Sequence, residues 1–164
     1  MKVELKILDD RISGLNYATA GAAAVDLRAC TLDPLGTPKP IIEKINLYPG
    51  HKVKIGAGVA LSLATMNHGE DASLRFAAII LPRSGLGTAG IQLSNVVGLI
   101  DEDFQGEIVM AIENRGEEVY VLEPTSRLAQ MYITPVIVPH FEVVDQFSAP
   151  SERGAGGFGS TGTV

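Results

Sequence analysis

The C-terminal segment has the residue types of a loop that binds phosphate. Arg153 precedes a glycine-rich run that contains Phe158, Gly159, Ser160 and Thr161. Glycines let backbone N–H groups point at an anion, hydroxyl groups add donors, and a guanidinium can bind a phosphate through two N–H groups. An aromatic ring can stack on a base. The run lacks the Gly-Lys-Ser/Thr of a Walker A loop, and the alternative is a flexible tail without a function.

A second candidate follows the apolar run at residues 76–81 directly. It contains Arg83, Ser84 and Gly85, and an arginine, an exposed serine and a glycine at the end of a strand suit an anion site. An ordinary turn capped by the serine explains the same residues equally well.

Two carboxylates stand next to apolar strands. Asp101 is the first polar residue after residues 96–100, so its apolar flanks could desolvate it and favour action as a general base. A solvated acidic turn at residues 101–103 is the alternative. Asn95, at the other end of the apolar run, could bind a polar ligand or its own backbone. Asp26 interrupts another strand, where it could hold water around a divalent cation or pair with an arginine in the sheet.

The elements that must position these residues are strands, because apolar residues recur with a period of two. Strands are expected at residues 2–7, 59–63, 133–140 and 141–145. The runs at residues 76–81 and 108–112 are expected to be buried on both faces, and a short helical piece is expected at residues 85–90. Eighteen glycines and nine prolines punctuate the chain at close spacing. This pattern predicts an all-β sandwich or barrel.

Composition excludes several classes of function. The chain has 164 residues, the size of one domain, and its net charge of −6 argues against a nucleic-acid-binding surface. Its apolar runs are too short to cross a membrane, and a single cysteine, Cys30, excludes an internal disulfide and a multi-cysteine zinc site. His51, His68 and His140 show no zinc-binding spacing. We expect a soluble, intracellular, cytoplasmic protein.

In their order along the chain, these segments resemble the five motifs of the homotrimeric, all-β dUTPase family. The motifs read Ala23-Ala-Val-Asp-Leu-Arg28, Pro82-Arg-Ser-Gly-Leu-Gly87, Asn95 through Glu107, Arg127-Leu-Ala-Gln-Met131, and Arg153 through Gly162. The resemblance covers nearly the whole chain. It implies a distorted, jelly-roll-like β-barrel over residues 1–147 and a flexible arm over residues 148–164 that closes over a neighbouring subunit's site.

The resemblance also implies the reaction, which is hydrolysis of dUTP to dUMP and pyrophosphate. Such an enzyme limits uracil incorporation into DNA and supplies dUMP for thymidylate synthesis. Water would attack the α-phosphorus in line with Mg²⁺ present, Asp101 would be the general base, and Asp26 would hold Mg²⁺ through water. Neighbouring Glu102 and Asp103 are not implicated, since the family varies at the first of them.

The implied substrate-binding residues fall into three groups. Ser84, Gly85 and Gln130 would hold the inner phosphates, beside an Arg83 that pairs with a carboxylate beneath the site. Asn95 and Gly98 would face the uracil, and Phe104 would pack under the deoxyribose. From the arm, Arg153, Gly159, Ser160 and Thr161 would close on the outer phosphates while Phe158 stacks on the base. Each site would draw on all three subunits of a homotrimer.

Three departures from the family pattern stand out. Ala24-Val25 replaces the usual Gly-Tyr or Gly-Leu before Asp26, Phe104 replaces the usual tyrosine, and Pro124-Thr-Ser126 replaces the usual Pro-Gly-acid before Arg127. None removes a charged catalytic group.

The alternatives to a dUTPase are a dCTP deaminase, which shares the fold, a non-catalytic nucleotide sensor and a structural jelly roll. The deaminase family has a catalytic Glu in place of the Asp, and the structural reading leaves the arm unexplained.

Overall fold

Strands are the predominant regular structure in the computed structural model, which describes residues 2–32, 37–66 and 73–157. The larger sheet has the order β4 (Lys39–Pro40), β3 (Thr31–Leu32), β6 (Lys52–Ser62), β10 (Glu107–Asn114) and β8 (Ile91–Leu93), with β1 (Glu4–Ile7) paired to β6. The second sheet has the order β2 (Val25–Arg28), β12 (Arg127–Ile137), β7 (Leu74–Pro82) and β9 (Gly98–Ile100). A small sheet joins β11 (Tyr120–Leu122) to β5 (Ile45–Leu47), and α1 (Ser84–Thr88) follows β7.

The two larger sheets contribute side chains to one aliphatic core. The fully buried members from the larger sheet include Ile55, Val59, Ile108 and Met110, and those from the second sheet include Leu27, Ile80, Leu128 and Met131. The chain crosses between the two sheets, as in the step from β8 in the larger sheet to β9 in the second sheet. The all-β, jelly-roll-like prediction is confirmed, although hydrogen bonds do not join the described strands into a closed barrel.

Strand β6 bends sharply in order to pair with three strands. Its first part pairs with β10 and β3, and its last part pairs with β1. The bend lies at Gly58, whose φ is +68° and whose position leaves no room for a side chain, since a Cβ would lie 2.9 Å from the Sγ of Cys30. Only glycine adopts this conformation at little cost. The bend therefore closes one end of the core.

The cysteine beside this bend is structural. Cys30 is fully buried, and burial raises the pKa of its thiol to about 11. The thiol is therefore neutral at physiological pH and packs as a small apolar side chain.

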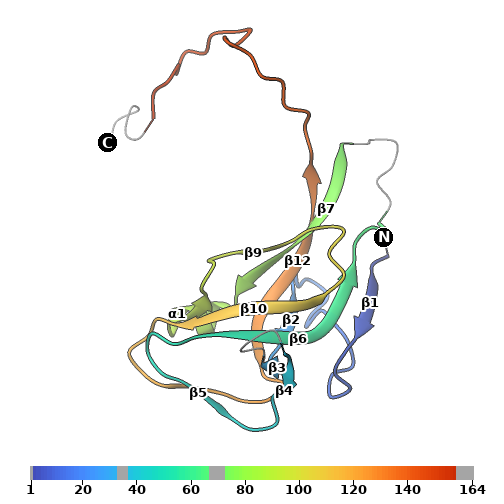
Figure 1. Ribbon diagram of the computed structural model, residues 1–164, viewed down its shortest axis with the longest axis vertical. Helices are drawn as coiled ribbons and strands as arrows, with labels where there is room; N and C mark the ends of the chain where they lie inside the picture. Colours follow the sequence, from blue (N-terminus) through green and yellow to red (C-terminus); the bar gives the residue numbers. More distant parts are fainter. Residues whose placement is uncertain (1, 33–36, 67–72, 158–164) are drawn as a thin grey trace.

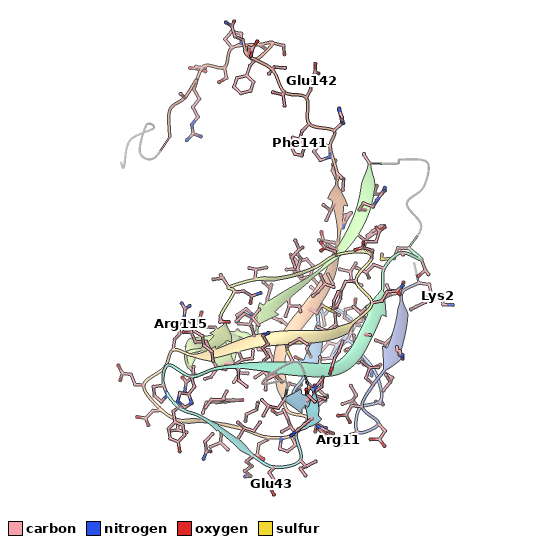
Figure 2. The ribbon with its side chains drawn as sticks, in the orientation of Figure 1. Lys2, Arg11, Glu43, Arg115, Phe141 and Glu142 are labelled. Carbon is pink, nitrogen blue, oxygen red and sulfur yellow. The ribbon has the colours of Figure 1, made fainter. Side chains whose placement is uncertain are left out.

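Two predictions about strands are wrong. Residues 108–112 are not buried on both faces, because Val109 is 37% exposed on the outer face of β10. Strand β12 ends at Ile137, and apart from a hydrogen bond from the Val138 N–H to the Ser73 carbonyl (2.8 Å) no strand pairing among the described residues continues over residues 138–145. Figure 2 shows Phe141 and Glu142 standing clear of both sheets.

The helical piece expected near residues 85–90 is present as α1. Nowhere in the described part of the chain is a helix both long and apolar enough to span a membrane.

Asn114 connects the small sheet to the end of β10. Its side chain is fully buried, donates to the carbonyls of Leu47 (2.7 Å) and Glu118 (2.8 Å), and accepts from the N–H of Gly116 (2.9 Å). The same turn lies against Gly90 at the end of α1, because the Arg115 N–H donates to the Gly90 carbonyl at 2.8 Å. One amide thus holds together the turns that support α1.

Replacing Asn114 with alanine should therefore destabilise the fold. We expect Asn114→Ala to lower the free energy of unfolding by about 2–4 kcal/mol, because three buried hydrogen bonds lose a partner. Asn46→Ala, on an exposed position of β5, is the matched control and should change it by less than about 0.5 kcal/mol. Urea unfolding at one fixed protein concentration measures both, and equal effects would contradict this role of Asn114.

Candidate active site

Asp26 lies at the centre of a cluster of charged side chains. Its Oδ1 is 2.8 Å from the Nε of Arg83, and its Oδ2 is 3.4 Å from a terminal guanidinium nitrogen of Arg127. Asp26 is largely buried and Arg83 partly so, whereas half of the Arg127 side chain is exposed. The carboxylate therefore holds two guanidinium groups at the surface of the second sheet. Arg83 pairs with a carboxylate as expected.

Strand register brings this cluster together. Asp26 of β2 lies opposite Gln130 of β12, which lies opposite Leu81 near the end of β7. Gln130 donates from its side-chain amide to the carbonyl of Pro82 at 3.0 Å, which fixes the amide beside the β7–α1 junction. Three neighbouring strands thus present polar groups at one place.

The junction after β7 exposes small polar groups. Arg83 is extended (φ −73°, ψ 138°), and the helix α1 begins at Ser84. Ser84 and Gly85 are exposed, and an added Cβ at Gly85 would meet no atom within 4 Å. The backbone and hydroxyl donors at this junction are therefore accessible to a ligand.

A polar pocket of about 180 Å³ borders the cluster. Asp26, Arg28 and Arg127 form one side of it, and the loop of residues 13–18 forms the other. Arg28 donates to the carbonyl of Thr125 at 2.8 Å, so its guanidinium is anchored. Nearby, burial raises the pKa of Tyr120, and the positive charge of Arg83 opposes that shift. Two arginines and one carboxylate leave a positive excess that suits an anion.

The segment that joins β8 to β9 carries a second set of predicted site residues, and it crosses from the larger sheet to the second sheet. Asn95 and the apolar Val96 and Val97 are exposed in this connection, where Val96 has a φ of +67°. Gly98 is buried against β7, since a Cβ there would lie 3.0 Å from the Cβ of Ile80. This close approach fixes the end of the β8–β9 connection on the second sheet.

Asp101 follows β9 directly and is exposed. Its carbonyl accepts from the N–H of Phe104 at 3.2 Å, which closes a turn. The Phe104 ring is 43% exposed and lies close to Gly106, where an added Cβ would lie 2.7 Å from the ring. One turn therefore presents a carboxylate and an aromatic ring.

Asp101 and the Asp26 cluster are separated along β7, whereas Gly98 pairs with Ile80, closer to Arg83. Ile100 pairs with Ala78, and continuing this register places Asp101 opposite Ala77. Ala77 and Arg83 are six positions apart on one extended strand, a separation of roughly 20 Å. A single chain therefore does not bring Asp101 to the Asp26 cluster.

The C-terminal segment touches neither set. Figure 1 shows the chain leaving the sheets after β12 and running away from them. Arg153 is exposed, and its Nε donates to the carbonyl of Gly156 at 2.9 Å. The predicted site residues Phe158, Gly159, Ser160 and Thr161 lie outside the described residues.

The described residues contain no group of three or more His, Cys, Asp or Glu side chains that could hold a metal ion. Asp26 already accepts a hydrogen bond from Arg127 and forms an ion pair with Arg83, which suits contact with a cation through water better than direct ligation.

Sequence reasoning left Arg127 out of the site. Its presence in the fourth motif was the available signal, but only the register of β12 and β2 shows that it pairs with Asp26.

Comparisons with known proteins agree on one family. A family model described as dUTPase matches residues 47–162. The deoxyuridine 5'-triphosphate nucleotidohydrolases of Burkholderia multivorans and Acinetobacter baylyi are 49% and 47% identical to this chain, with 99% of each chain covered. Among solved structures, a mutant dUTPase of Staphylococcus bacteriophage 80alpha with dUpNHpp has a TM-score of 0.73 at 21% identity, with 98% of both chains covered. A mutant dUTPase of phage phi11 of S. aureus, whose structure describes a structural Mg(II) ion, has a TM-score of 0.70 at 17% identity, with 91% of this chain and all of that chain covered.

The geometry around Asp26 predicts unequal coupling to its two arginines. A double-mutant cycle of Asp26→Asn with Arg83→Gln should give a coupling energy of up to about 1 kcal/mol, because that pair is short and partly buried. The cycle with Arg127→Gln serves as the matched control and should give less than half of this value. Urea unfolding at one protein concentration measures both cycles, and a larger coupling to Arg127 would contradict the geometry.

Proposed function

The chain belongs to the dUTPase family and is a dUTP diphosphatase, and we propose that Asp101 is the general base of its reaction. Asp101 would orient and deprotonate a water that attacks the α-phosphorus of dUTP in line, which yields dUMP and pyrophosphate. The position of Asp101 carries this proposal: it is an exposed carboxylate directly after β9, a strand fixed to β7 by its pairing and by the close approach of Gly98.

The Asp26 cluster is proposed to bind the inner phosphates. Ser84 and Gly85 offer accessible donors beside Gln130, whose amide is held by the Pro82 carbonyl. Arg83 supplies positive charge while Asp26 fixes its orientation. Phosphoryl transfer depends on such positioning and charge neutralisation more than on covalent help.

Mg²⁺ is the proposed cofactor, and Asp26 would contact it through water. When bound, Mg²⁺ would neutralise charge on the triphosphate and on the pyrophosphate that leaves. The partly exposed edge of the Asp26 carboxylate can accept hydrogen bonds from water while both arginines stay in place.

We propose that each active site is shared between subunits of a homotrimer. Asp101 and Arg83 lie too far apart along β7 to act on one triphosphate within a chain. Exposed apolar residues support burial against other copies, namely Val96 in the β8–β9 connection (66% exposed), and Phe141 and Val143 after β12 (85% and 99% exposed). Another chain would therefore bring its Asp101 turn to the Asp26 cluster.

Substrate selection is proposed to occur on the β8–β9 connection. Backbone groups near Gly98 and the Asn95 amide would pair with the uracil edge, and the narrow space there would exclude a 5-methyl group. The Phe104 ring would pack under the deoxyribose and exclude a 2′-hydroxyl, although it lacks the phenol oxygen usual in the family. Phe158 would stack on the base.

Residues 148–164 are proposed to form an arm that closes over a site of other subunits. Arg153, Gly159, Ser160 and Thr161 would bind the outer phosphates, and closure would expel water from the site.

Because its substrate belongs to the intracellular nucleotide pool, we propose that the enzyme is cytoplasmic. There it would limit uracil incorporation into DNA and supply dUMP for thymidylate synthesis.

Substitution of Asp101 tests the proposed base. Asp101→Asn should lower kcat for dUTP by about 10²–10⁴-fold, because the amide cannot accept the proton of the attacking water. Binding of the non-hydrolysable analogue dUpNHpp should be retained. Pyrophosphate release from dUTP, dTTP, UTP and dCTP, with and without a chelator, measures turnover and selectivity.

Asp103→Asn is the matched control, since it removes a second exposed carboxylate from the same turn, and it should keep its activity. Unchanged turnover by Asp101→Asn would remove Asp101 from the proposed role. Ammonia release from dCTP would instead identify a deaminase.

Truncation tests the arm. Deleting residues 148–164 should leave the trimer intact by light scattering and lower kcat/KM by at least about 10²-fold, since the arm's contacts to phosphate and base are lost. A truncated protein with full activity would contradict the proposal, whatever its oligomeric state.

A further inference from the structure

We propose that Glu102 is a positioning residue for the hydrolysis, because its carboxylate anchors the turn that carries Asp101 and Phe104. The inference rests on the proposed function, since it assumes that Asp101 acts on the water. It concerns a residue to which the family resemblance gives no role.

Glu102 takes the place that a strand would occupy beside β7. The β7–β9 pairing ends with Ala78 opposite Ile100, and continuing the register places Glu102 opposite Phe76. There the Oε2 of Glu102 accepts from the backbone N–H of Phe76 at 3.0 Å. A side chain thus satisfies a buried strand donor where the backbone ladder has ended.

The second carboxylate oxygen of Glu102 faces the preceding residue of β7. Its Oε1 is 3.9 Å from the Nε of Arg75, and the Glu102 side chain is only 20% exposed. Arg75 is itself tied to its strand, because it donates to the Leu74 carbonyl at 2.8 Å. Both oxygens of Glu102 are therefore directed at consecutive residues of one strand.

This anchor lies inside the turn that presents the proposed base. The N–H of Phe104 donates to the Asp101 carbonyl, so Glu102 is the second residue of a four-residue turn. Asp101 and Glu102 border the same pocket, of about 200 Å³, beside Phe76 and Ala77. Fixing Glu102 on β7 restricts the backbone on either side of it, and with it the directions of the Asp101 carboxylate and the Phe104 ring.

The two roles of Glu102, hydrogen-bond acceptor and ion-pair partner, can be separated. Glu102→Gln keeps an oxygen that accepts from the Phe76 N–H but removes the charge that faces Arg75. Glu102→Ala removes both. Because the hydrogen bond is short and the charged contact is long, the acceptor should dominate.

The experiment measures kcat and KM for dUTP, dUpNHpp binding and thermal unfolding for the full-length enzyme. Glu102→Ala should lower kcat by about 10- to 100-fold with little change in KM, because small displacements of a reacting group are costly. Glu102→Gln should recover kcat to within about threefold of the wild type, since its amide oxygen replaces the acceptor. Gln105→Ala, an exposed side chain in the same loop, is the control and should match the wild type.

A double variant distinguishes positioning from general damage. If Glu102 acts through Asp101, adding Glu102→Ala to Asp101→Asn should lower turnover no further. Two results would overturn the inference. One is a further loss of turnover in the double variant equal to the loss that Glu102→Ala causes alone. The other is a Glu102→Ala variant that keeps the wild-type kcat and differs from the wild type only in thermal unfolding. In both cases an inactive Asp101→Asn would leave the proposed function intact. A fully active Asp101→Asn would instead overturn the proposed function and this inference together.

Discussion

An extended strand cannot fold back on itself, and this constraint governs the arrangement of the site. Strand β7 fixes the Asp26 cluster through Arg83 at one end and the Asp101 turn through the register with β9 at the other. Strand β12 pairs along the whole of β7 and β9 pairs with its middle, so neither end can bend toward the other without breaking the second sheet. This separation supports the proposal that the groups that act on one triphosphate come from different copies of the chain.

Local patterns in the sequence predicted the elements well where each strand has a partner within the chain. The alternation at residues 2–7 and the apolar run at residues 76–81 both became paired strands. The same alternation at residues 141–145 did not, because the pattern reports compatibility with a sheet and not the presence of a neighbour. Val109 shows the opposite error. Because it is apolar, the sequence pattern predicts that it is buried, although it lies exposed on the outer face of β10.

The site residues were predictable as types but not as contacts. The sequence left open whether Asp26 pairs with an arginine or holds water around a cation, and the structure shows the pairing, with Arg83 and Arg127 as the partners. Spacing could not reveal this, because Asp26 and Arg127 meet only through the register of β2 and β12. Glu102 was set aside because the family varies at this position, and its contact with the Phe76 N–H depends on where β9 ends.

The glycine-rich arm follows from the same geometry. The chain leaves its own sheets at Ile137 and exposes Phe141 and Val143. Folding back onto these sheets would stabilise the segment little, because no strand of the described residues pairs with it. Glycines raise the entropy lost when such a segment becomes ordered, so in the proposed arm the contacts with phosphate and base must exceed that loss before it closes. On this proposal, closure depends on the ligand. A site built from a base of one chain, phosphate donors of another and an arm that excludes water would then be complete only when substrate is bound.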